Sequence, residues 1–243
     1  MNDREIALAS TYFRMYGWML SLVSMNENIH FQGIASATRS LFELMLDMEL
    51  IQSDKDGRLV QQYHTFVRVE KYRVANRIVA FSNQSESQAG DYLESLQKFI
   101  EKVDSGDIAS DLQNNWGLSK EKVMKGNLKH WTGLGVIQRA RQVDQIYGDV
   151  KNESLYHEVY SLLSWYIHSG STGTLGLTDK AIDSIFRLCH YLVHQMFINA
   201  TEICAKEFKI DLAIHDFNNL LDEASLVGAK YIQEQGKSII SST

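Results

Sequence analysis

Residues 34–51 read IASATRSLFELMLDMELI, and this stretch indicates how the rest of the chain folds. Apolar side chains recur at helical spacing along one side of it, and Phe42, Leu46 and Leu50 form a second apolar side. A helix that is apolar around most of its circumference is buried among other elements. We therefore predict a central helix that ends near Ser53, with the remaining segments packed around it.

Helical periodicity continues on both sides of this stretch, and no window alternates in the manner of a strand. Thr178 is a plausible N-cap for the longest of the later helices. Residues 107–135 fit neither regular type and are predicted to be a loop with short helical turns. The chain is thus expected to form a single all-α domain over 1–243, a helical bundle of about seven or eight helices. Besides the central one, helices are predicted at 4–25, 58–81, 92–103, 136–146, 155–167, 178–208 and 217–235.

The composition of the 243 residues favours long helices in a reducing compartment. Proline, the strongest helix breaker, is absent. Cys189 and Cys204 fall within one predicted helix, where a separation of fifteen positions keeps them from forming a disulfide. No uncharged apolar run approaches about eighteen residues, and the N-terminus lacks the pattern of a signal peptide. A cytoplasmic location without a membrane partner is expected.

Positive charge is concentrated in two segments of a chain whose net charge is −6. Residues 116–141 contain six Lys or Arg and one acid, and residues 57–80 contain five Lys or Arg and one acid. Such segments bind polyanions or phosphate groups in some proteins and are solvated faces in others. The sequence leaves both interpretations open.

Several common signatures of catalysis are missing. The chain has no Walker A loop, GxGxxG, GxSxG or CxxC, so nucleotide hydrolases, dehydrogenases and α/β hydrolases are poor matches. His190 and His194 have the spacing of two metal ligands, but no third ligand is evident. We expect neither a metal nor a cofactor.

Two groups of polar residues are candidates for a site. On the central helix, Arg39 and Glu43 are four residues apart, and Asp47 follows one turn later. A polar line on an otherwise apolar helix either holds an anionic ligand or fixes the packing of helices.

The second group follows the helix predicted at 155–167 to its end. Its members recur at every fourth position and are Tyr156, Tyr160, Ser164 and His168. A histidine in the last turn of a helix is near unpaired carbonyl groups, which favour its protonated form. His168 is therefore a candidate acid, base or phosphate contact. The alternative is that the stripe packs against a neighbouring helix with its polar groups satisfied locally.

The sequence resembles a bacterial family of helical domains of unassigned function. The resemblance is carried by the pair Arg39-x-x-x-Glu43, by Trp131 and Arg139, and by the run Tyr160-x-x-x-Ser164-x-x-x-His168. That family is similar to the HEPN domains (higher eukaryotes and prokaryotes nucleotide-binding). The resemblance covers roughly residues 30 to 200. It implies a HEPN-like bundle, in many cases dimeric, and in active members a metal-independent ribonuclease of a toxin or defence system.

HEPN ribonucleases carry Arg-x(4 to 6)-His, whereas the matching positions upstream of His168 are Ser161, Leu162 and Leu163. The cation would have to come from elsewhere, and Arg39 is the candidate. The resemblance then implies that Arg39 contacts phosphate, Glu43 orients Arg39, and His168 moves the proton.

The hypothesis assigns ligand binding to four further residues, Tyr160, Ser164, Trp131 and Arg139. It predicts a homodimer that binds RNA or a phosphate-containing small molecule, and it leaves open whether the protein is an enzyme. The alternative is a non-catalytic interaction or scaffold protein in which the same residues form a structural polar network.

Overall fold

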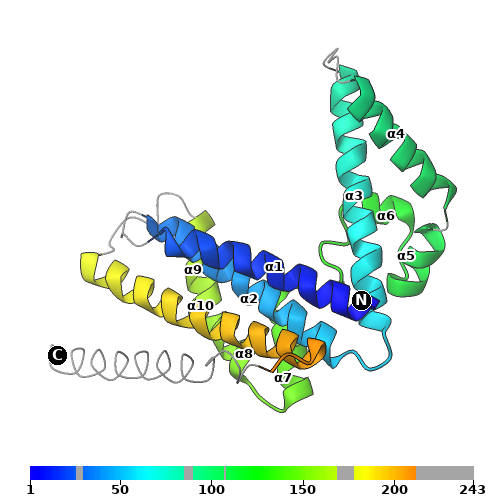
Figure 1. Cartoon of the computed structure of the whole chain (residues 1–243). Helices are drawn as coiled ribbons and strands as arrows, with labels where there is room; N and C mark the ends of the chain where they lie inside the picture. Colours follow the sequence, from blue (N-terminus) through cyan, green and yellow to red (C-terminus); the bar gives the residue numbers. More distant parts are fainter. Residues whose placement is uncertain (26–29, 85–89, 107, 169–177, 212–243) are drawn as a thin grey trace.

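The computed structural model describes residues 1–25, 30–84, 90–106, 108–168 and 178–211. Within these ranges the chain is helical and contains no strand (Figure 1), which confirms the all-α prediction. The helices are α1 (Asp3–Val23), α2 (Phe31–Ser53), α3 (Arg58–Gln84), α4 (Gly90–Ser105), α5 (Ile108–Trp116), α6 (Lys120–Met124), α7 (Val136–Tyr147), α8 (Lys151–Leu155), the π-helical turn η2 (Tyr156–Tyr160), α9 (Ser161–His168) and α10 (Asp179–Phe208).

Because α8, η2 and α9 follow one another without a break, the described residues form nine separate helices. The number exceeds the prediction because α5 and α6 occupy the first part of the segment expected to be irregular. The helix predicted at 217–235 and the glycine-rich segment at 169–173 lie outside the described residues. The single domain over 1–243 stays a prediction.

Local signals explain where two helices begin. Asn2 caps α1, since its Oδ1 accepts from the Glu5 backbone amide at 2.9 Å while Glu5 Oε2 accepts from the Asn2 amide at 2.8 Å. α10 begins directly after Thr178, as predicted. Both cysteines lie on α10, where they are buried and unpaired.

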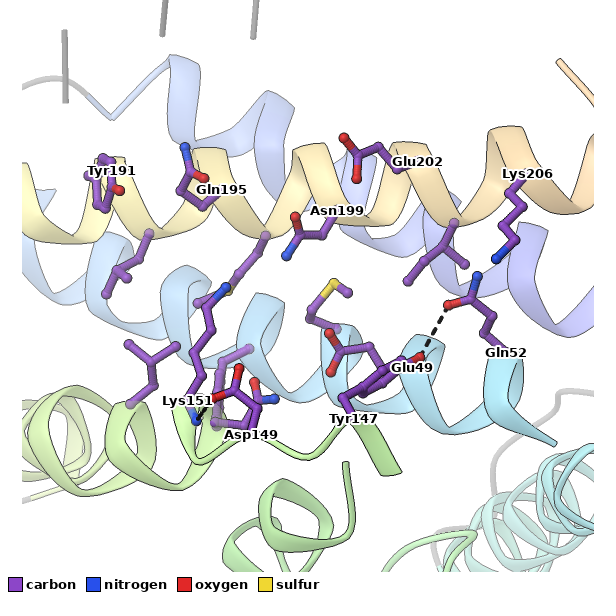
Figure 2. Close-up of a pocket in the computed structure, with 17 residues that line it drawn as sticks. Glu49, Gln52, Tyr147, Asp149, Lys151, Tyr191, Gln195, Asn199, Glu202 and Lys206 are labelled. Carbon is purple, nitrogen blue, oxygen red and sulfur yellow. Dashed lines mark hydrogen bonds between the residues drawn. The ribbon is translucent and has the colours of Figure 1, made fainter. Parts of the chain in front are cut away.

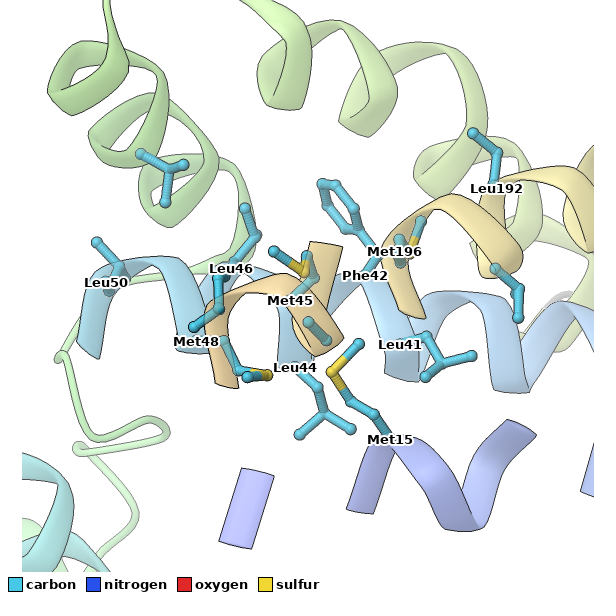
Figure 3. Close-up of a cluster of buried hydrophobic side chains, with 14 of the residues drawn as sticks. Met15, Leu41, Phe42, Leu44, Met45, Leu46, Met48, Leu50, Leu192 and Met196 are labelled. Atoms are coloured by element: carbon cyan, nitrogen blue, oxygen red, sulfur yellow. The ribbon is translucent and has the colours of Figure 1, made fainter. Parts of the chain in front are cut away.

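The main hydrophobic core surrounds α2, which packs against α1, α7, α9 and α10. α1, α2 and α10 run side by side, as Figure 1 shows. Leu41, Leu46, Met48 and Leu50 of α2 are completely inaccessible to solvent, and Met15 of α1 reaches the same cluster (Figure 3). The prediction of a central helix is confirmed.

A smaller core lies along the middle of α3. It contains Val69, Tyr72, Leu112, Val123 and Leu128, so α3 to α6 and the chain just after α6 bury a cluster of their own. In Figure 1 these helices form a lobe that extends from one end of the main bundle. The first half of α3 remains in the main core through residues such as Tyr63.

None of the described helices is both long and apolar enough to cross a membrane.

Candidate functional site

The polar line of α2 lies inside the bundle. Arg39, Glu43 and Asp47 lie along one stripe of the helix; Asp47 is buried, and Arg39 and Glu43 are half-buried. Charged groups in such positions need partners, because an unpaired buried charge is costly. Each of the three has a partner on another segment of the chain.

Tyr160, at the end of η2, connects Arg39 to Glu43. Its hydroxyl accepts a hydrogen bond from Arg39 Nη2 at 2.9 Å and donates one to Glu43 Oε1 at 2.8 Å. The Arg39 guanidinium also lies 4.6 Å from the centre of the Tyr160 ring, a cation–π arrangement. Burial raises the pKa of Tyr160, so the phenol keeps its proton and remains a donor to Glu43.

Arg139, on α7, binds both carboxylates of the line. Its Nη2 donates to Glu43 Oε2 at 3.1 Å and its Nη1 donates to Asp47 Oδ1 at 2.7 Å. The side chain is only 2% exposed. Sequence reasoning proposed Arg139 as a ligand contact, but the hydrogen bonds described for its guanidinium all go to groups of α2.

His130 completes the network and was not singled out by the sequence. Its Nε2 lies 3.3 Å from Asp47 Oδ2, and its Nδ1 lies 2.9 Å from Thr132 Oγ1. The Thr132 amide donates to Nδ1, which assigns the proton to Nε2 and makes Asp47 its acceptor. Residue spacing in the sequence could not identify His130, because it lies outside the predicted helices and its partner Asp47 is 83 positions away.

These contacts form one chain of polar groups, which we call the α2 network. It is composed of Arg39, Tyr160, Glu43, Arg139, Asp47 and His130. The network connects α2 to α7, to η2 and to the segment between α6 and α7, and it holds their relative positions.

Two other predicted ligand contacts are used within the protein. The Trp131 ring is 2% exposed and packs edge-on against Tyr63, with ring centres 5.7 Å apart. Ser164 Oγ donates to the Tyr160 carbonyl of its own helix at 2.8 Å. Neither side chain therefore presents its main contact surface to a ligand in this conformation.

The four-residue stripe expected from Tyr156 to His168 is interrupted. At η2 the Ser161 amide bonds the Tyr156 carbonyl five positions back, so one extra residue enters the turn. Tyr156 and Tyr160 stack there with ring centres 5.2 Å apart. His168 ends α9, but its side chain lies outside what the structure describes, so its predicted approach to Arg39 stays a prediction.

An open cleft of about 520 Å³ borders the α2 network. We call it the α1–α3 cleft, since α1, α2 and α3 form its walls together with the segment that carries His130. Glu43, Asp47, His130 and Trp131 line its inner part, and the His130 side chain is 19% exposed. Arg14 of α1 and Lys71 of α3 lie at its exposed rim.

Each carboxylate of this cleft forms an ion pair with an arginine. Glu43 and Asp47 pair with Arg139, and Glu70 pairs with Arg73. Arg14 and Lys71 form no ion pair with any described carboxylate. The cleft therefore has two unused cations and is able to attract an anion.

The family of unknown function DUF5677 matches residues 5–183, which is most of the chain. The chain belongs to the DUF5677 family. The match includes the whole α2 network and the α1–α3 cleft, and it ends shortly after the start of α10. No curated protein and no solved structure matches the chain.

The described residues of this DUF5677 protein contain no group of three or more His, Cys, Asp or Glu side chains placed to hold a metal ion.

Proposed function

We propose that this DUF5677 protein binds a phosphate-bearing ligand in the α1–α3 cleft, with RNA as the ligand that the resemblance to HEPN domains favours. The observation that carries the proposal is the pair Arg14 and Lys71, which form no ion pair with a described carboxylate and lie above carboxylates that are already paired with arginines. Lys and Arg in such positions neutralise phosphate charge and make binding depend on salt.

In this proposal the α2 network positions the cleft wall. Arg139 and Asp47 hold His130 where it lines the cleft, with Nε2 committed to Asp47. Arg39 is engaged with Tyr160, so its proposed role changes from a direct phosphate contact to a support for that wall. Ser40, half-buried beside the network, adds a hydroxyl to the same cleft.

Fluorescence anisotropy with a labelled single-stranded RNA tests the proposal. Reversal of both cations, Arg14→Glu with Lys71→Glu, is expected to weaken binding by about tenfold or more and to flatten its salt dependence. The matched control is Lys98→Glu with Lys125→Glu, which changes the net charge equally at exposed ion pairs elsewhere. Equal losses in both double variants would mean that general charge, and not this cleft, attracts the RNA.

RNA cleavage is the catalytic part of the hypothesis, and two histidines are its candidates. His168 is implied by the resemblance, and His130 lines the cleft. Incubation of labelled RNA in EDTA with the wild type, His130→Ala and His168→Ala assigns the role. The proposal expects cleavage by the wild type and its loss in one folded variant, whereas an intact substrate in every sample leaves a binding protein.

A HEPN-like relationship, a cytoplasmic location and a homodimer belong to the same proposal. The all-helical bundle supports the first. The dimer is supported by a row of exposed apolar residues on α1, namely Ile6, Phe13, Tyr16 and Leu20.

The second candidate is a scaffold protein, and it is favoured by the burial of Arg139. A guanidinium that is 2% exposed and bonded to two carboxylates is typical of a structural network. If RNA and nucleotides fail to bind while variants of the network only lower the melting temperature, this candidate is correct.

A further inference from the structure

A second cavity, of about 580 Å³, lies on the side of α2 away from the network. Its walls are α2, the end of α7 with the start of α8, and α10, as Figure 2 shows. The volume falls within the range of small-molecule sites in proteins. The α10 wall lies beyond the part of the chain that matches the family.

The cavity combines an apolar floor with several hydrogen-bonding groups. Met45, Leu155, Met196 and Ile203 are among the apolar residues. Four carboxamide side chains line it as well and are labelled or drawn in Figure 2: Gln52, Asn152, Gln195 and Asn199. Such a lining suits a ligand with one polar group and a hydrocarbon part.

Glu49 is the unusual residue of this cavity. Its Oε2 has almost no exposed surface and no hydrogen-bond partner among the described residues. The nearby phenol of Tyr147 donates to Gln52 Oε1 at 3.3 Å and not to Glu49. Buried polar groups are otherwise hydrogen-bonded, so this oxygen lacks the partner that such a position requires.

The cations of the cavity do not supply this partner. Lys151 and Lys206 line it, but both are exposed, and neither forms an ion pair with Glu49. Lys151 stabilises the charged form of Glu49 only at a distance. The half-buried Glu49 side chain thus lines a space large enough for a ligand, and its Oε2 has no hydrogen-bond partner among the described residues.

The wall beside Glu49 is held firmly. The buried Asp144 carboxylate accepts from the backbone amides of Asn152 and Glu153 at 3.0 and 2.8 Å, which fixes the start of α8. Gly148 ends α7 with φ 70°, a backbone angle that favours glycine. The turn that carries Asp149 and Lys151 is therefore set in place before a ligand arrives.

We propose that this cavity binds a small molecule with a primary amine, whose ammonium group pairs with Glu49. An ammonium group has three donors and no acceptor, which suits a cavity that offers one carboxylate and several carboxamide side chains. The hydrocarbon part of the amine would lie on the apolar floor. This site is independent of the α1–α3 cleft and shares no lining residue with it.

Binding should depend on pH because Glu49 must be ionised. Burial raises the pKa of Glu49 to about 7. Below that pH the carboxyl is mostly protonated, so Glu49 must release its proton when an ammonium ligand binds. Affinity is expected to rise about tenfold from pH 6 to pH 8. The other charged or titratable groups that face Glu49 or line the cavity are Asp144, Tyr147, Asp149, Lys151, Tyr191, Glu202 and Lys206.

The test compares amines with alcohols of the same shape on the full chain. Ligand-observed NMR and calorimetry would use n-butylamine and phenethylamine against 1-butanol and 2-phenylethanol. We expect an amine to bind about tenfold or more tightly than its alcohol at pH 8, and Glu49→Gln to abolish the difference. Glu202→Gln, an exposed change on the same cavity, is the matched control and should retain binding within about twofold.

The inference is overturned if neither amine binds at 10 mM, if alcohols bind as well as amines, or if folded Glu49→Gln and Glu49→Asp bind the amine unchanged. Binding of alcohols that weakens as the pH rises would instead assign Glu49 as a protonated donor. The Arg14→Glu and Lys71→Glu variant should bind the amine normally, so failure of the RNA proposal does not affect this result.

Discussion

At the scale of single residues, Arg139 and Glu49 show two different environments for a charged group inside the protein. Arg139 forms ion pairs with both the Glu43 and the Asp47 carboxylates, so its charge is paired inside the protein. Glu49 has no such partner, and burial raises its pKa to about 7. A matched charge holds helices together, whereas an unmatched one leaves a group that a ligand or a proton can neutralise.

Glu49 should make stability fall as the pH rises. A carboxyl whose pKa is raised from 4.5 to about 7 binds a proton more tightly in the folded state than in the unfolded state. Its effect on stability is therefore lost progressively between about pH 4.5 and pH 7, by about 3 kcal/mol in total. Urea unfolding at pH 5 and pH 8 should show this decrease in the wild type and a smaller one in Glu49→Gln. Parallel pH profiles for the two proteins would contradict the argument.

Arg139→Met should be strongly destabilising. The change leaves Glu43 and Asp47 near each other without their shared cation, and removal of one member of a buried ion pair costs about 3–5 kcal/mol. Arg141→Met is the control, because Arg141, two positions further along α7, forms a more exposed ion pair with Glu153 of α8. That change should cost less than about 1 kcal/mol. Similar urea midpoints for the two variants would show that the network contributes little.

At the scale of helices and loops, the segment between α5 and α7 depends on Arg73 of α3. The buried guanidinium donates to the Leu128 carbonyl at 2.8 Å and to the Val123 carbonyl, and it pairs with Glu70. One side chain thus attaches α6 and the chain after it to α3. This attachment also fixes the position of the segment that leads to His130.

Arg73→Met should loosen this lobe and leave the main bundle intact. Two buried carbonyls would lose charge-assisted hydrogen bonds, each worth about 1.5–3 kcal/mol. Hydrogen exchange followed by mass spectrometry should show faster exchange at 118–128 and unchanged protection in α2. Arg68→Met is the control on the same helix, since its ion pair with Asp111 is exposed. Equal exchange in both variants would remove Arg73 from this role.

The sequence was informative where periodicity is long. The 34–51 stretch predicted the buried central helix, and the spacing of Arg39 and Glu43 predicted a polar line that the structure places against Tyr160. The extra residue of η2 was not predictable, because five residues are too few to show a change of period. His130 was missed because its partner Asp47 is distant in the chain and close only through the fold.

At the scale of the whole molecule, α2 separates two cavities whose charged groups are paired differently. On one side, Arg14 and Lys71 of the α1–α3 cleft form no ion pair with a described carboxylate; on the other, Glu49 Oε2 has no hydrogen-bond partner among the described residues, although two exposed lysines line the same cavity. Because both cavities lie against the same rigid helix, a ligand in one is able to affect the other only through α2 or the helices packed on it. Measurement of amine binding with and without RNA would detect such coupling.

The exposed apolar row of α1 should be the dimer contact. Phe13 is 70% exposed and Leu20 is 55% exposed, with heptad spacing between Ile6, Phe13 and Leu20. An apolar row at this spacing suits the same row on a second copy of the chain, related by a two-fold axis. Light scattering should therefore give twice the 27.8 kDa mass of the chain, and Phe13→Asp should give a single chain with an unchanged helical spectrum.

Phe81→Asp, at an equally exposed position on α3, is the control and should remain dimeric. A wild-type protein that stays at 27.8 kDa at high concentration would exclude the dimer, and a dimer disrupted by Phe81→Asp alone would move the contact to α3.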